Sequence, residues 1–193
     1  MAYDNGAAAM MNNPATLGLG AEGDTMSLMI GGLGPDVAVV GGQSSDGDAY
    51  YMPAAGWTRK SGSLTYGVGM FAQGGMGTEY ARGVDGLPER SELGVGRLIA
   101  PLVYNVDSKL TIGGSVDFVW AMLDLKMAMP IASMAGLITD PGNGTIAGAL
   151  GGMMTAGYDN ARLDYSDDSD YTGKAKGYGL AGKIGFTYKI NDM

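Results

Sequence analysis

The chain has 193 residues, of which 35 are glycine and 15 methionine, with no cysteine or histidine and a formal net charge of −8. The missing residue types exclude disulfides, cysteine nucleophiles and the commonest general base and metal ligand. The acidic balance argues against nucleic acid as a partner, because phosphates need a basic surface. No apolar run approaches the ~20 residues of a membrane-spanning helix, and the N-terminus lacks the basic start and apolar core of a signal peptide. We therefore expect a cytoplasmic protein, or an exported one in a mature or trimmed form.

The first segment, Ala9–Gly20, has neither the caps nor the regular period of a surface helix. Pro14 has no amide hydrogen and a fixed φ, which favours a defined bend. The preceding Asn13 is biased toward an extended backbone and can hydrogen-bond locally. An ordered bend and a disordered terminus with one proline turn both fit this segment.

The rest of the chain alternates between large apolar and small or polar residues, which is typical of β-strands. The clearest examples are "LTYGVGMF" from Leu64, "LTIGGSVDFVW" from Leu110 and "YGLAGKIGFTYK" from Tyr178. We predict six strands, near residues 24–40, 50–60, 63–73, 91–105, 109–127 and 174–190.

Two architectures fit this alternation. In a soluble β-sandwich the polar face meets water, whereas in a transmembrane barrel the apolar face meets lipid and small or polar side chains face the lumen. The high glycine content and the alternation of short turns with long connections favour the barrel. Aromatic residues at strand ends fit its interfacial girdles: Tyr66, Trp120, Tyr178 and Tyr188. A barrel requires Leu110, Ile112, Val116 and Phe118 to face lipid, while Thr111, Ser115 and Asp117 face inward.

Three charged residues fall on the predicted inner face: Arg97, Asp117 and Lys183. A charge on the lumen side avoids the penalty of about 2–4 kcal/mol that Lys or Arg incurs at the lipid midplane. We expect Arg97 and Lys183 to pair with Asp117 or with carbonyls of the N-terminal segment. Either cation could instead bind the carboxylate of a ligand.

The long connection Met127–Tyr158 is rich in Met, Leu, Ile and Ala, although a solvated loop is usually polar. We predict a short helix over Ile131–Thr139. Methionine is flexible and polarizable, so this connection suits apolar ligands of varied shape, although the same residues could simply pack the loop. The later cluster Asp167, Asp168 and Asp170 could bind Ca²⁺ through its carboxylates, but its spacing matches no complete EF-hand loop, so we interpret it as a solvated acidic loop. We find no catalytic constellation and expect no metal site, no cofactor and no enzymatic activity.

The order of these motifs resembles the N-terminal part of the FadL/TodX family of outer-membrane transporters for hydrophobic compounds. The shared features are Asn-Pro-Ala at residues 13–15, the hairpin with Pro53 and Trp57, and the two later hairpins, "LGVGRLIAPLVYNVDSKLTIGGSVDFVWA" and "GYGLAGKIGFTYKIND". The resemblance covers nearly the whole chain.

The resemblance implies an all-β fold, a segment of about six strands of a larger transmembrane antiparallel barrel. Residues 1–22 would form an N-terminal hatch carrying Asn13, Pro14 and Ala15, and residues 23–193 the barrel segment with a partly helical extracellular loop. The family's first ligand site maps onto apolar residues of that loop: Met129, Ile131, Met134, Leu137, Ile138, Met153 and Met154.

The implied function is passive uptake of hydrophobic molecules, with long-chain fatty acids first and aromatic hydrocarbons as an alternative. The implied location is the outer membrane of a Gram-negative bacterium, in contact with its lipid. Six strands cannot enclose a lumen and a plug, so we expect a fragment, or another chain that supplies the missing strands. The alternative function is a structural or adhesive surface β-protein without a transported ligand.

Overall fold

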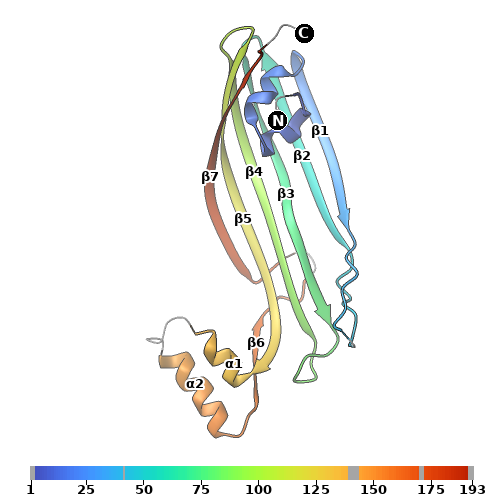
Figure 1. Cartoon of the computed structure of the whole chain (residues 1–193), viewed down its shortest axis with the longest axis vertical. Coiled ribbons are helices and arrows are strands. Elements are labelled where there is room, and N and C mark those ends of the chain that lie inside the picture. The colour runs from blue at the N-terminus through green and yellow to red at the C-terminus, as the bar shows by residue number, and fades with distance from the viewer. Residues whose placement is uncertain (1–2, 41, 139–143, 170–171, 191–193) are drawn as a thin grey trace.

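The computed structural model describes residues 3–40, 42–138, 144–169 and 172–190. Its strands form one antiparallel sheet, curved into a long trough with the N-terminal segment at one end and two helices at the other (Figure 1). The strands are β1 (Gly23–Leu33), β2 (Tyr50–Ser61), β3 (Leu64–Tyr80), β4 (Glu89–Asn105), β5 (Leu110–Pro130), β6 (Asn160–Tyr165) and β7 (Ala175–Tyr188). Consecutive strands pair from β1 to β5, as tight hairpin turns such as Gly62–Ser63 dictate.

β6 and β7 both pair with β5 and together fill one strand position. Leu125 pairs with Tyr165 and Leu123 with Ala175, so one residue of β5, Asp124, corresponds to nine residues of the partner, 166–174. The partner therefore has eight more residues here than β5 can pair with, and we call the described part of this segment, residues 166–169 and 172–174, the strap. β6 lies within the predicted long connection, so the prediction of six strands missed this interruption.

Two other boundaries differ from the prediction. β1 ends at Leu33 rather than near residue 40, because Gly34 and Pro35 follow and proline cannot donate to the ladder. The long connection holds two helices, α1 (Ile131–Gly136) and α2 (Gly144–Thr155), where one was predicted. The predicted helix end at Thr139 lies outside the described residues. Neither described helix is long and apolar enough to cross a membrane.

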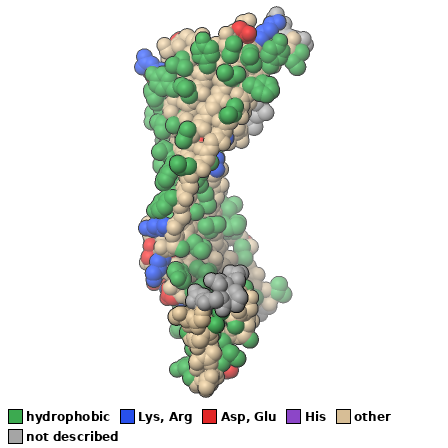
Figure 2. All heavy atoms as spheres, turned by 90° about the vertical axis from the view of Figure 1, so that its left-hand side faces the viewer, with side chains coloured by type: hydrophobic (Ala, Val, Ile, Leu, Met, Phe, Trp, Pro, Cys, Tyr) green, Lys and Arg blue, Asp and Glu red, His purple; other side chains and the backbone are tan. Residues whose placement is uncertain are grey.

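The two faces of the sheet differ as predicted. Val116 and Phe118 of β5 are exposed on the outer face, while Thr111 and Asp117 are buried on the inner one. The same outer face of β7 carries Tyr178, Leu180, Ile184, Phe186 and Tyr188, all exposed. Figure 2 shows hydrophobic side chains along the side of the molecule that β7 and β5 present. The orientation required for a barrel wall is therefore confirmed.

Aromatic rows border this apolar face at two levels. Leu110 pairs with Tyr188, and Trp120, ten residues further along β5, pairs with Tyr178. At about 3.3 Å per residue and a tilt of about 40°, ten residues rise about 25 Å, the height of the lipid-facing band of a membrane barrel. Beyond Met122 the outer positions become charged, beginning with the pair Glu92 and Asp124. We infer that β3, β4 and β5 extend beyond the bilayer at this end.

The N-terminal segment forms two 3-10 helices, η1 (Gly6–Met11) and η2 (Pro14–Leu19), which lie against the inner face outside the ladder. A buried apolar cluster joins them to β3 and β4: Ala7, Ala9, Met10, Leu17, Phe71, Ile99 and Val103. The glycines of the wall make this approach possible, because a methyl group at Gly113 or Gly185 would strike Ala15 or Asn13.

Candidate functional site

The ladder between β2 and β3 is interrupted partway along both strands. Pairing runs from Ser61↔Leu64 to Ala54↔Phe71 and then stops, although β2 stays paired with β1 and β3 with β4. Two local features explain the stop: Pro53, the next residue of β2, has no backbone N–H, and β3 carries a bulge between Ala72 and Gly74. We call this interruption the β2–β3 break.

The break has a far border as well. The connection after β1 folds back onto the end of β3, where the backbone N–H of Asp46 donates to the Glu79 carbonyl at 2.9 Å. The Ser45 hydroxyl oxygen accepts from the Glu79 N–H at 3.0 Å. The Gln43 side-chain amide accepts from the Arg82 N–H at 3.1 Å and donates to the Arg82 carbonyl. The break is thus enclosed between a ladder pair and a tied-down loop.

A cavity of about 700 Å³ lies at the break, and we call it the wall cavity. β2 lines it with Tyr50–Pro53, and β3 with Met70, Ala72, Gly74 and Gly75. Gly94, Gly96, Trp120 and Met122 of β4 and β5 extend the lining, and Arg90, Glu92, Asp124 and residues 172–173 of the strap form its polar end. The volume is in the range of small-molecule sites, and the lining is apolar with a few polar groups at one end.

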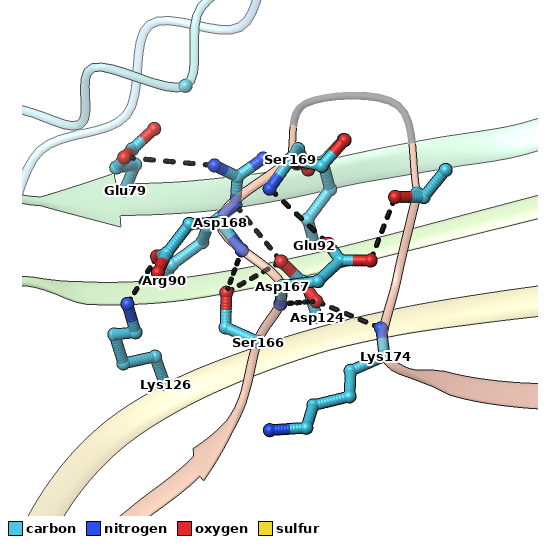
Figure 3. A network of polar contacts seen from close by, with 12 residues as sticks. Glu79, Arg90, Glu92, Asp124, Lys126, Ser166, Asp167, Asp168, Ser169 and Lys174 are labelled. Carbon is cyan, nitrogen blue, oxygen red and sulfur yellow. Dashed lines mark hydrogen bonds and ion pairs between the residues drawn. The ribbon is translucent and has the colours of Figure 1, made fainter.

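Asp124 holds the strap against the wall at this polar end (Figure 3). Its carboxylate accepts hydrogen bonds from the Ser166 hydroxyl at 2.7 Å and from the backbone N–H groups of Asp167 and Lys174, each at 3.1 Å. Arg90 places Nε 3.8 Å from the same carboxylate and donates to the Ser169 carbonyl at 2.8 Å. Asp124 is 1% exposed, so its charge is balanced by these donors rather than by water.

The strap also has an outer ion pair, between Lys126 and Asp168. A hydrogen bond from Lys126 holds the pKa of the Asp168 carboxyl below its usual value. No three metal-binding side chains cluster among the described residues, and Asp170 of the acidic loop lies outside them.

The three predicted lumen charges meet on the inner face. Lys183 Nζ lies 2.8 Å and Arg97 Nη1 3.2 Å from the same oxygen of Asp117, and the Ser115 hydroxyl donates to the other oxygen at 2.6 Å. Asp117 is fully buried. The cations therefore pair with Asp117, one of the two predicted arrangements, and their contribution to ligand binding stays a prediction.

The hatch motif is built into the wall. The Asn13 side chain caps η2 by accepting from the Ala15 N–H at 3.1 Å, and it donates to the Phe186 carbonyl of β7 at 3.2 Å. Pro14 occupies the first position of η2, where its missing N–H costs nothing.

Two residues outside the motif hold the same segment. Lys60 Nζ donates to the carbonyls of Gly18 and Gly20, at 2.8 and 2.9 Å, and Asn105 donates to Gly18 at 3.0 Å. The alternation in β2 places Lys60 on the inward face, and this was the sequence signal that could have identified it as a partner of the N-terminal segment.

The predicted ligand residues of the helical loop divide into two groups. Ile131, Met134, Ile138 and Met153 pack with Leu150 and Ala161 in a small core beneath α1 and α2. Leu137 and Met154 are exposed, and Met129 is half-buried in β5 beside Ala161. None of the seven lines the wall cavity. Packing thus accounts for four of them, and capture of ligands by the loop stays a prediction.

Solved structures share this architecture. The toluene transporter TbuX of Ralstonia pickettii is 32% identical with a TM-score of 0.77, over 98% of this chain and 50% of TbuX. The toluene transporter TodX of P. putida is 28% identical with a TM-score of 0.71, over 98% of this chain and 49% of TodX. The monoaromatic hydrocarbon channel CymD, at 22% identity and a TM-score of 0.67, supports the fold alone. No protein-family model matches the sequence, and no curated protein does.

The fold is a segment of a transmembrane antiparallel β-barrel with an internal N-terminal segment. The chain belongs to the FadL/TodX family and spans about half the length of the transporters it matches.

Proposed function

We propose that this chain forms the part of an outer-membrane channel through which small hydrophobic molecules pass passively, and that the β2–β3 break is their route through the wall. The observation that carries the proposal is the wall cavity, because it joins an apolar lining to a place where no strand ladder closes the sheet. The route avoids the N-terminal segment, which Lys60, Asn105 and Asn13 fasten to the wall. Movement of that segment is the alternative route.

Small aromatic hydrocarbons are the substrates we place first. The matched proteins are described as toluene transporters, and the cavity lining combines methionines with a tryptophan, side chains that bind aromatic rings well. Long-chain fatty acids are the second candidate, with the lumen cations Arg97 and Lys183 as carboxylate partners once a ligand displaces Asp117. A structural or adhesive role remains the alternative from another class, and it requires no ligand.

The proposed location is the outer membrane of a Gram-negative bacterium. The apolar face and its two aromatic rows support contact with lipid. Within the described residues β1 and β7 each pair with one neighbouring strand, and a strand edge in lipid needs a partner. We propose that further strands, from the same protein or another chain, close the barrel.

Filling the break tests the route. Gly74 lines the cavity and has open space around its Cβ position, so Gly74→Trp meets no neighbour at Cβ and adds bulk to the cavity. Uptake of labelled toluene and of labelled oleate would be measured in cells expressing the protein from its natural gene. We expect at least a tenfold slower uptake of the transported compound.

Gly148→Trp is the matched control, because Gly148 also has open space but lies on α2 away from the cavity. It should leave uptake unchanged. Equal uptake by both variants, with normal insertion, would contradict the route through the break. A wild type that takes up neither compound would favour the structural role.

A further inference from the structure

We propose that Trp120 is the residue by which the wall cavity recognises a planar aromatic ring, so that the cavity binds such rings in preference to unbranched alkyl chains. This inference rests on the proposed function and adds to it a specificity-determining residue.

Trp120 lies in register with the start of the β2–β3 break. It pairs with Gly96 of β4, and Gly96 pairs with Ala72 of β3, the last residue before the bulge. The row across the sheet is therefore one large ring followed by two of the smallest residues. Neither Gly96 nor Ala72 places a large side chain between Trp120 and the break.

The Trp120 ring lies over the Gly96 backbone. A methyl group at Gly96 would strike ring atoms of Trp120, chiefly carbons of the six-membered ring. Glycine at this position thus allows the indole to lie across β4 toward the break. The ring also lines the wall cavity, together with Met70 and Met122.

Neighbouring aromatic rings support Trp120 from the other side. The Phe118 centroid lies 6.3 Å from that of Trp120, and Phe118 stacks with Tyr178 at 5.9 Å. Neither Phe118 nor Tyr178 lines the cavity, so Trp120 is the one member of this cluster that meets a cavity ligand. A buttressed indole beside two thioethers favours an aromatic guest, because stacked rings and sulfur–ring contacts add to the area buried.

An interfacial anchor is the competing explanation, since tryptophans commonly sit at the border of the lipid-facing band. The chain has two tryptophans, Trp57 and Trp120, and Trp57 is outward-facing but outside the cavity lining. The fluorescence that Trp120→Phe loses relative to the wild type therefore reports Trp120, and the fluorescence that Trp57→Phe loses reports Trp57, whatever tryptophans the other strands of the barrel carry. Bromobenzene and 1-bromooctane quench tryptophan on contact through their bromine atoms.

The test is a quenching titration of the wild type and both variants with each bromide, using the closed barrel in detergent micelles. We expect bromobenzene to quench Trp120 saturably, with toluene reversing the effect, and 1-bromooctane to quench it only in proportion to its concentration. Quenching of Trp57 should rise in proportion to concentration with both bromides. Adding Gly96→Ala to the Trp57→Phe variant moves the indole without removing it, and should raise the half-saturating bromobenzene concentration about threefold to tenfold.

Proportional quenching of Trp120 by bromobenzene would overturn the proposal and leave the residue as a membrane anchor. Saturable quenching by 1-bromooctane at equal or lower concentration would overturn the preference for rings. Both results are independent of the Gly74→Trp uptake experiment, so a failure of ring recognition is distinguishable from a failure of the route.

Discussion

Asp117 is the single residue on which the inner face depends most. It is fully buried and is the shared partner of Lys183 and Arg97. Asp117→Ala leaves both cations in a low-dielectric site without their carboxylate, so we expect the free energy of unfolding to fall by about 3–5 kcal/mol. Urea unfolding in lipid vesicles would measure the loss. Asp24→Ala removes an exposed ion pair with Arg59 and should cost under about 1 kcal/mol; equal losses would contradict the assignment.

Asp107, in the turn between β4 and β5, links stability to pH. The backbone N–H groups of Lys109 and Leu110 donate to its carboxylate, which lowers the pKa of Asp107. A lowered folded-state pKa adds stability above the unfolded-state pKa, and this contribution is lost as the pH falls through the folded-state value. The stability difference between wild type and Asp107→Asn should therefore shrink between neutral pH and pH 2. A difference independent of pH would show that the charge plays no part.

The strap depends on one carboxylate for its position. Asp124 accepts its three hydrogen bonds from Ser166, Asp167 and Lys174. Asp124→Ala should release residues 166–169 and 172–174, seen as at least tenfold faster amide hydrogen exchange there, with β7 exchanging as before. Asp168→Asn removes the charge that pairs with Lys126, keeps a residue type that tolerates the positive φ of 55° at this position, and should change exchange little. Slow exchange in both variants would mean that backbone geometry alone holds the strap.

The sequence predicted the elements better than their interruptions. Alternation predicted strands where β1–β5 and β7 lie and the inward direction of Asp117, because side-chain direction in a strand is a local property. It did not predict β6. The β2–β3 break and the strap were missed, because both depend on where the pairing between two strands stops, and the alternation within a single strand does not show this. By alternation alone, Arg90 and Asp124 would face lipid. They are tolerated because the strap covers them and because they lie beyond the apolar band.

The position of the whole molecule in the bilayer follows from the two aromatic rows. Val116 lies between them on the outer face of β5, and Met122 lies just past the row that contains Trp120 and Tyr178. Val116→Arg should lower the free energy of unfolding in lipid vesicles by about 2–4 kcal/mol, and Met122→Arg by about 0–1 kcal/mol. Similar losses at the two positions would contradict the inferred depth.

The β2–β3 break also divides the molecule mechanically. Beyond Ala54↔Phe71, no ladder joins the β1–β2 hairpin to the β3–β4–β5 panel within the described residues. Polar contacts across this region include those of Gln43, Ser45 and Asp46 with the end of β3 and with Arg82, and a hydrogen bond between the Tyr50 side chain and the Gly77 backbone. Under a pulling force these contacts would yield first, because few hydrogen bonds share the load. The β2–β3 ladder would then break one residue pair at a time, starting at Ala54↔Phe71. When the barrel is unravelled from its N-terminus, the β1–β2 hairpin should therefore detach as one discrete step after the N-terminal segment has been released.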